Sequence, residues 1–319
     1  MIEIVRYNPS MLRQWEEFVA HAKNSTFLHL RSYMDYHSDR FDDCSLVAVD
    51  GAKWLAVLPA NCVGNTLYSH QGLTYGGWLT PAAHFDAIDM LAVWDAMNLV
   101  LPQWGIDTLV YKAVPHIYHS YPAEEDIYAI FRNGGALTAS AISSAIPLEA
   151  PLRFDQNARR SVASATRQGV TIAESEDYEP FWQVLTELLD SRYGVAPVHS
   201  LDEIRLLHSR FPDRIRLFTA NHDGKVVAGV VIYDTGIVAH AQYIAASPEG
   251  KALKALPMLF DHLIQEVFVN RRWFDFGTST EQGGHYLNQG LLRQKAGMGG
   301  RGVAYNTYTL HIEAGKKDI

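Results

Sequence analysis

The sequence predicts an α/β protein, with mixed α+β sheets, made of two similar domains related by internal duplication. Three observations predict this: a hairpin in each half, a helix and a strand after each hairpin, and a glycine pair before the last strand of each half. The 319 residues, of which 48% are hydrophobic and 19% charged, suffice for two cores. We place the domains at 1–150 and 151–319.

The two hairpins are the clearest elements. Ser45–Asn65 and Ile215–Gly236 each read as a strand, an Asp-Gly turn and a second strand. Asp-Gly between alternating apolar residues favours a tight turn, because both turn positions require positive φ. The shared pattern indicates that the halves are copies of one unit.

The elements after the hairpins also match. Apolar residues at helical spacing over 85–100 precede a predicted strand over 105–114, and those over 253–268 precede one over 271–279. Three pairs have nearly the same separation: Asp50 and Asp223, Asp107 and Asp275, and Gly134-Gly135 and Gly299-Gly300. Helices are predicted to open each half, over 9–23 and 31–40 in the first and over 154–168, 178–193 and 201–211 in the second.

Charge and motifs exclude several classes of function. A formal net charge of −8 argues against general DNA binding, and no apolar run is long enough for a membrane span. GxxxxGK[ST] and GxSxG motifs are absent, and the His-x-x-His at 116–119 lacks the further ligands of a metal site. We expect Cys44 and Cys62 to be reduced, buried thiols of a cytoplasmic protein.

Four segments carry a resemblance to a known group. They are the predicted strand Phe274–Ser279, the segment Leu287–Leu291, Lys295 before a glycine-rich turn, and the segment Tyr111–Phe131. With the order of elements, they resemble the tandem-GNAT acyltransferases of the FemABX-like and BioF2-like group. The resemblance implies that an acyl donor lies where two central parallel strands splay apart, with its phosphates at the start of the following helix.

The resemblance places the donor site along the strand over 238–247 and the helix after it. We expect the donor, acetyl-CoA or another acyl-CoA, to contact seven residues: His240, Gln242, Ala246, Gly250, Lys251, Asn288 and Lys295. Of the usual glycine-rich pyrophosphate signature only Gly250 remains, and Glu249 would repel a phosphate. The identity of the acyl carrier therefore stays open.

Three residues are candidates for catalysis: Asp275, Tyr243 and Ser279. Asp275 stands between two aromatic residues and is either a general base or a buried structural carboxylate. Strand alternation predicts that His240 and Gln242 share one face and that Tyr243 points to the other. The polar side chains either line the splay or face solvent.

Four residues are candidates for acceptor binding: Tyr118, His119, Arg160 and Arg167. Tyr118 and His119 belong to an aromatic-histidine cluster that is either a ligand-stacking surface or a packed domain interface. Arg160 and Arg167 share a helix face that either binds an anionic substrate or is merely solvated. We expect the acceptor in a groove between the halves.

Together these observations predict an N-acyltransferase that acts on an amine, such as an amino sugar or an amino acid. The partner is then a small molecule or a cell-envelope precursor, with no DNA, no metal and no membrane span. The alternatives are aminoacyl transfer from transfer RNA to a cell-wall precursor, which is less favoured because no long charged helical insertion is present, and a ligand-binding protein of the same fold without catalysis.

Overall fold

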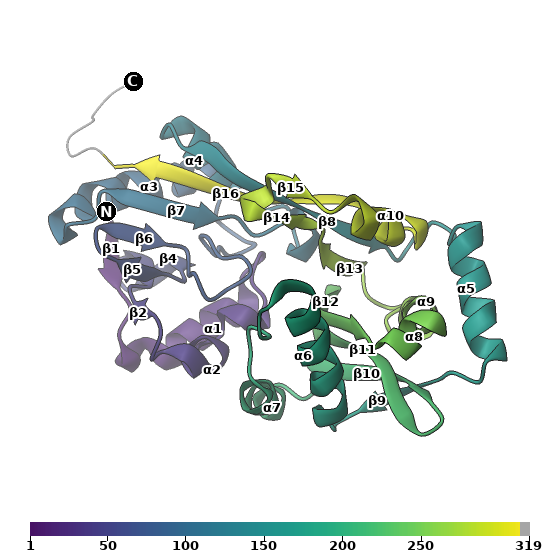
Figure 1. The fold of residues 1–319 in the computed structure, drawn as a ribbon. Coiled ribbons are helices and arrows are strands. Elements are labelled where there is room, and N and C mark those ends of the chain that lie inside the picture. The colour runs from purple at the N-terminus through teal and green to yellow at the C-terminus, as the bar shows by residue number, and fades with distance from the viewer. Residues whose placement is uncertain (313–319) are drawn as a thin grey trace. The chain divides into compact units, whose positions relative to one another are not determined.

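The computed structural model describes residues 1–312, which form two compact units. Unit 1 comprises Met1–Ala141, Gln282–His285 and the described residues from Ala304 onward. Unit 2 comprises Ile142–Glu281 and Tyr286–Val303. The long strands β8 (Ala136–Pro147) and β16 (Arg301–His311) contribute residues to both units (Figure 1).

Unit 1 opens with a strand and two helices, as the sequence predicts for the helices. Its elements are β1 (Ile2–Arg6), α1 (Leu12–His21), α2 (Arg31–Met34), β2 (Asp42–Asp43), β3 (Leu46–Asp50), β4 (Lys53–Leu58), β5 (Asn61–Val63), β6 (Thr66–Tyr68), α3 (Ala87–Val100), β7 (Thr108–Lys112), α4 (Glu125–Arg132) and β8 (Ala136–Pro147). Strands β1, β3 and β4 form a three-stranded antiparallel sheet, and β2, β5, β6, β7 and β16 are neighbours in that order.

Unit 2 repeats this plan with longer strands. Its elements are α5 (Gln156–Arg167), β9 (Thr171–Ser175), α6 (Glu179–Tyr193), α7 (Leu201–Arg210), β10 (Ile215–His222), β11 (Lys225–Asp234), β12 (Val238–Ala246), α8 (Pro248–Ala252), α9 (Ala255–His262), a π-helical turn (Leu263–Val267), β13 (Trp273–Thr278), β14 (Thr280–Glu281), β15 (Tyr286–Leu287), α10 (Gln289–Gly297) and β16 (Arg301–His311). The strand order is β13-β12-β11-β10-β9.

Both units contain the same succession of elements, which confirms the predicted duplication. A hairpin, a strand, a helix, a parallel strand, a short helix and a last strand follow one another as β3–β4, β6, α3, β7, α4 and β8, and as β10–β11, β12, α8–α9, β13, α10 and β16. In each unit the helix crosses between two parallel strands, β6 to β7 and β12 to β13. The Asp-Gly turn at Asp223-Gly224 has positive φ at both residues.

One predicted correspondence is wrong. Asp107 precedes β7 and is exposed, where its carboxylate accepts a hydrogen bond from Asn65 Nδ2 at 2.6 Å. Asp275 instead lies inside β13 and has no solvent exposure. The two residues differ in place because Asp107 belongs to the turn that leads into the strand.

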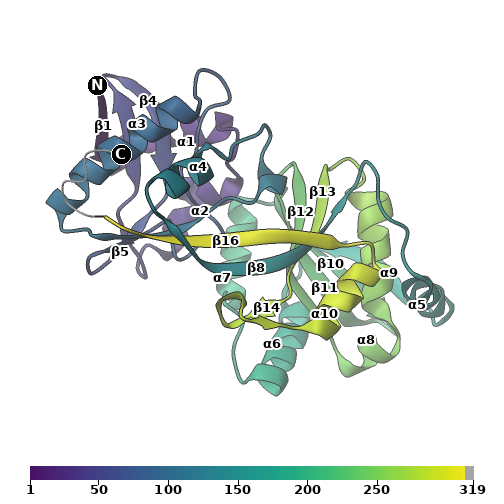
Figure 2. The ribbon, with the colours of Figure 1, turned by 90° about the horizontal axis from the view of Figure 1, so that it is seen from above.

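Helices cover the strands of unit 2 on both faces. Leu259 and Phe260 of α9 pack with Phe274 and Phe276 of β13 in one apolar cluster. The other face carries α6, where Trp182 contacts the ring of Tyr243 edge-on at 5.1 Å. Figure 2 shows α9 and α6 on opposite sides of β10–β12. Strands β10–β12 therefore separate the side chains on the α6 face from the α9 cluster.

The cysteines differ from the sequence prediction. Cys44 and Cys62 form a disulfide, with their Cα atoms 5.7 Å apart. The pairing of β2 with β5 brings them together, because Asp42 lies opposite Cys62 and Cys44 N–H donates to Ala60 O at 3.0 Å. The prediction of reduced thiols is therefore wrong. The sequence did not reveal that β2 and β5 pair, because strands this short leave no clear pattern. Within residues 1–312, no helix is both long and apolar enough to cross a membrane.

Candidate active site

Strands β12 and β13 diverge in the middle of unit 2. They pair in parallel only where Val238–His240 lies beside Trp273–Asp275. Beyond Asp275 a register shift interrupts β13, and Thr278 pairs with Ser143 of β8. Gly277, inside the shift, has a φ of +76° that a residue with a side chain rarely adopts. This irregularity turns β13 away from β12 and opens the sheet next to His240 and Asp275.

A bulge in β12 changes which side chains share a face. Val231 of β11 lies opposite Tyr243, and Ile232 lies opposite Ala241, so Gln242 is an extra residue. His240 and Tyr243 therefore face the same side of the sheet, contrary to simple alternation. The prediction that Tyr243 points to the face opposite His240 is wrong, because one inserted residue reverses the alternation.

His240, Asp275 and Ser143 form a hydrogen-bonded chain at the divergence. His240 Nδ1 lies 2.8 Å from Asp275 Oδ2, and Ser143 Oγ donates to Asp275 Oδ1 at 2.5 Å. The N–H of Gly277 also donates to Oδ1, at 3.2 Å. The Asp275 side chain is fully buried, whereas 12% of the His240 side chain is exposed. Of this pair, the imidazole is the group that an incoming substrate can reach.

Lys295 and Ser279 lie at the end of β13. Lys295 is buried, and its ammonium donates to Gly277 O and Thr278 O at 2.8 Å each. Burial lowers the pKa of Lys295 to about 8, although the nearby Asp275 acts in the opposite direction. Ser279 Oγ is buried without a hydrogen-bond partner among the described residues. Asn288 N–H donates to Ser279 O at 2.9 Å and thereby joins the start of α10 to this group.

Tyr243 serves packing more than chemistry. Its hydroxyl bonds to Nδ1 of the buried His199, and only 8% of the residue is exposed. Its ring also packs against Trp182. The phenol therefore lies between β12 and α6, and the assignment of Tyr243 as a catalytic residue stays a prediction.

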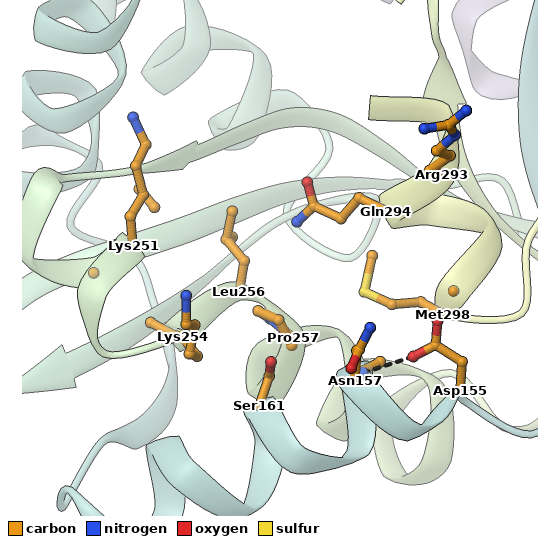
Figure 3. A pocket seen from close by; sticks show the side chains of 15 residues that line it. Asp155, Asn157, Ser161, Lys251, Lys254, Leu256, Pro257, Arg293, Gln294 and Met298 are labelled. Carbon is orange, nitrogen blue, oxygen red and sulfur yellow. Dashed lines mark hydrogen bonds between the residues drawn. The ribbon is translucent and has the colours of Figure 1, made fainter. Parts of the chain in front are cut away.

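An open cavity of about 460 Å³ lies in unit 2 between α5, α8, α9 and α10 (Figure 3). Lys251, Lys254 and Arg293 line it, and all three are exposed. Its apolar lining includes Leu256 and Met298, which pack against the α9 face of the sheet. The cavity thus joins a cationic rim to an apolar wall. Among the expected donor contacts, Ala246, Gly250 and Lys251 line the cavity, whereas His240, Gln242, Asn288 and Lys295 do not.

Gly250 has a structural reason to be glycine. A Cβ at this position would lie 2.1 Å from Val227 O, so the start of α8 packs directly on β11. Its N–H donates to Ser247 Oγ at 3.1 Å. Glu249 lies on the same turn, with His222 Nδ1 at 2.9 Å from its carboxylate. Positive charge at the cavity therefore comes from lysine and arginine side chains more than from the backbone N–H groups at the start of α8.

The expected acceptor residues do not gather in one place. Arg160 and Arg167 are exposed on α5, and neither lines the cavity. Tyr118 and His119 lie buried in unit 1, where Tyr118 Oη is 2.8 Å from Tyr305 Oη. His119 Nε2 lies 3.0 Å from Val114 O, and burial lowers the pKa of His119 to about 4. Tyr118 and His119 therefore belong to the packed interior of unit 1.

Unit 1 closes the opening that corresponds to the one in unit 2. Ser69, which follows β6, accepts a hydrogen bond from Lys112 N–H at 2.7 Å and donates its own N–H to Val110 O. The Lys112 ammonium donates to Leu73 O at 2.7 Å. Strand β7 and the loop after β6 stay joined in this way.

Within residues 1–312, no group of three or more His, Cys, Asp or Glu side chains could hold a metal ion.

Sequence reasoning missed Ser143, Lys254, Arg293 and Met298. Ser143 had a signal, because a Ser-Ser pair interrupts the otherwise apolar end of β8. Lys254, in the turn before α9, and Arg293, on α10, had none, because isolated cations at exposed positions are common. Their relation to one cavity depends on how α8, α9 and α10 pack.

Comparison with known proteins agrees with this geometry. Residues 153–286 match the family described as acetyltransferase (GNAT) domain. Together with the solved structure of FemX, this match confirms the predicted resemblance to tandem-GNAT proteins of the FemABX-like group for the fold. No curated protein sequence matches the chain significantly.

Solved structures of the same fold cover nearly the whole chain. FemX has a TM-score of 0.67 at 11% identity, with 98% of both chains covered. A Bacteroides thetaiotaomicron protein of unknown function has a TM-score of 0.62 at 12% identity, with 98% of this chain and 100% of that chain covered. The C-terminal domain of a putative lysylphosphatidylglycerol synthetase from Agrobacterium fabrum has a TM-score of 0.58 at 12% identity, with 95% of this chain and 92% of that chain covered.

Proposed function

We propose that unit 2 is an N-acyltransferase that moves an acyl group from a phosphorylated carrier, such as acetyl-CoA or another acyl-CoA, to an amine. The observation that carries the proposal is the His240–Asp275 pair at the point where β12 and β13 diverge. A base beside an opening in the sheet suits a reaction in which two substrates meet there.

The cavity fits the carrier by its chemistry. Lys251, Lys254 and Arg293 offer cations for phosphate groups, and Leu256 and Met298 offer an apolar wall for a flexible arm. None of these three cations has an ion-pair partner within the described residues. A bound thioester carrier would supply an activated acyl carbon.

His240 takes the proton of the attacking amine. An ionised Asp275 can only accept hydrogen bonds, so His240 Nδ1 carries the hydrogen and Nε2 carries the lone pair. As the amine nitrogen bonds to the acyl carbon, its proton passes to Nε2 and the carbon–sulfur bond breaks. The proton then passes to the thiolate, so the products are an amide and a thiol. Ser279, with its unpartnered hydroxyl, and Lys295 are the proposed donors to the carbonyl oxygen.

As the acceptor we propose a molecule that carries a primary amine: an amino sugar, an amino acid or a cell-envelope precursor. We propose that the reaction takes place in the cytoplasm.

A second donor is suggested by two observations. The name of one structural neighbour refers to an aminoacyl lipid, and the cationic rim also suits a nucleic-acid carrier. Aminoacyl-tRNA is therefore the second donor to test.

Thermal unfolding with candidate donors tests the proposal first. A donor that binds only the folded protein raises the apparent stability, by about 2.7 kcal/mol at a hundredfold excess over Kd. Acetyl-CoA, longer acyl-CoAs and aminoacyl-tRNA are the ligands to compare. The double variant Lys254→Ala/Arg293→Ala should lose the shift, whereas Arg160→Ala, an exposed cation outside the cavity, should keep it.

Product formation separates an enzyme from a binding protein. Thiol release from the bound acyl-CoA should depend on an added amine from a panel of amino sugars and amino acids. Binding without release for any amine would leave a non-catalytic ligand-binding protein. Equal shifts in the double variant and the Arg160→Ala control would place the donor elsewhere.

A further inference from the structure

We infer that Ser143 is a positioning residue that orients His240 through Asp275. The inference rests on the proposed function, because it explains how the base in that reaction is held. Ser143 comes from β8, far in sequence from both partners, and sequence reasoning gave it no role.

The two oxygens of Asp275 are bonded differently. Oδ1 accepts hydrogen bonds from Ser143 Oγ at 2.5 Å and from Gly277 N–H at 3.2 Å. Oδ2 lies 2.8 Å from His240 Nδ1. Two donors on one oxygen prevent the carboxylate from rotating about its Cβ–Cγ bond. The other oxygen is therefore kept toward the imidazole.

The local backbone explains why Ser143 can reach the carboxylate. Asp275 pairs with Ala145 of β8, and after the register shift Thr278 pairs with Ser143. The same irregularity that opens the sheet thus places the serine hydroxyl and the Gly277 N–H on one side of Asp275. The opening in the sheet and the two hydrogen bonds to Asp275 Oδ1 therefore have a common structural origin.

Burial makes the serine hydroxyl hard to replace. Ser143 and Asp275 are both 0% exposed, so bulk water has no direct access to the carboxylate. Hydrogen bonds to a charged group are stronger than those between neutral groups. Without the hydroxyl, Asp275 Oδ1 loses the shorter of these two hydrogen bonds, and His240 loses its fixed orientation and tautomer.

The test compares three variants of the full chain. Ser143→Ala removes the hydroxyl, and Ser143→Thr keeps it. Ser144→Ala is the matched control, because Ser144 is also buried on β8 but has its Cβ beside Gly300. We expect Ser143→Ala to lower kcat about tenfold to a hundredfold, at unchanged KM for the donor, and Ser143→Thr to restore most of it. Ser144→Ala should retain the wild-type kcat.

A spectroscopic measurement decides the inference without any assay of turnover. In protein labelled with ¹⁵N-histidine, the signal missing from His240→Gln identifies His240. We expect this signal to show the Nδ1–H tautomer in the wild type and in Ser144→Ala, and a mixture of tautomers in Ser143→Ala. An unchanged tautomer in Ser143→Ala, or the same loss of kcat in Ser144→Ala, would overturn the inference. If no acyl transfer is found at all, the proposed function fails, and the tautomer still decides whether Ser143 positions His240.

Discussion

His240 Nδ1 and Asp275 Oδ2 lie 2.8 Å apart at the last paired position of β12 and β13. The two residues are neighbours only because the strands run parallel up to that point. One residue further along β13, the sheet opens. A base with its orienting carboxylate therefore stands at the edge of the opening, where a substrate can approach the exposed part of the imidazole.

Replacing His240 and Asp275 should give distinguishable results. We expect His240→Gln to lower turnover about 10²–10⁴-fold, the usual contribution of a general base, at unchanged donor binding. Asp275→Asn should lower turnover as well, and it should also lower the melting temperature, because a buried amide would meet the Ser143 and Gly277 donors. Kinetics, donor titration and thermal unfolding on each variant provide the comparison. Normal turnover in His240→Gln would remove the base from the mechanism.

Gly250 should behave as a packing residue. Gly250→Ala places a methyl group 2.1 Å from Val227 O, and backbone cannot yield as a side chain can. We expect a loss of about 1–3 kcal/mol in the free energy of unfolding. Gly290→Ala is the control, since its Cβ would meet only Asn288 Oδ1 at 3.8 Å, and it should be neutral or stabilising by up to about 1 kcal/mol. Equal stability of the two variants would contradict the tight packing of α8 on β11. A substitution at Gly250 is thus no clean probe of donor binding.

Asp126 should make the stability of unit 1 depend on pH. It is buried, accepts a hydrogen bond from Tyr111 Oη at 2.6 Å, and burial raises its pKa to about 7 from an ordinary value of 3.8. The folded state therefore holds the proton more tightly than the unfolded state. Its contribution to stability is full below about pH 4 and is lost as the pH rises through about 7.

The variant Asp126→Asn removes this titration and keeps an oxygen for Tyr111. As the pH rises from 5 to 8, the variant should gain stability relative to wild type by about 2.6 kcal/mol, the part of the shift from 3.8 to about 7 that falls in this window. Urea unfolding of both proteins at the two pH values measures the difference, in which the other titrating groups cancel. Parallel changes in wild type and variant would show that Asp126 does not change its protonation in that range.

The elements could be predicted because their signals are local. The Asp223-Gly224 turn is an example, since its two residues alone favour the hairpin that the structure contains. Residue composition also drew attention to His240 and Asp275, because polar residues interrupted apolar strands. What the sequence could not show was that they touch, since this depends on the parallel register of β12 and β13.

Errors arose where one residue changes a register or a pairing. The bulge at Gln242 puts Tyr243 on the face of His240, and alternation has no way to include an inserted residue. The disulfide between Cys44 and Cys62 depends on strands of two and three residues, which leave no periodic pattern. Lys254 and Arg293 of the cationic rim were not predicted for a related reason, because they come from separate parts of the chain, the turn before α9 and the helix α10.

Gly277 should control the opening between β12 and β13. A Cβ there would lie 3.5 Å from Ala241 O and 3.6 Å from His240 Cε1, which is ordinary contact across the gap. The methyl group of Gly277→Ala therefore fits, but it occupies the space beside the imidazole. Because Gly277 has a φ of +76°, the substitution also strains the backbone by about 1–2 kcal/mol.

Gly224→Ala separates these two effects. Gly224 has a φ of +73° and nothing within 4 Å of its would-be Cβ, so this variant carries the backbone strain without narrowing the opening. Both variants should lose similar stability in urea unfolding. Only Gly277→Ala should also lose kcat/KM, by at least tenfold, because the added methyl group displaces substrate from His240. Equal kcat/KM in the two variants, measured with the same donor and amine, would show that the reaction does not use the gap between β12 and β13.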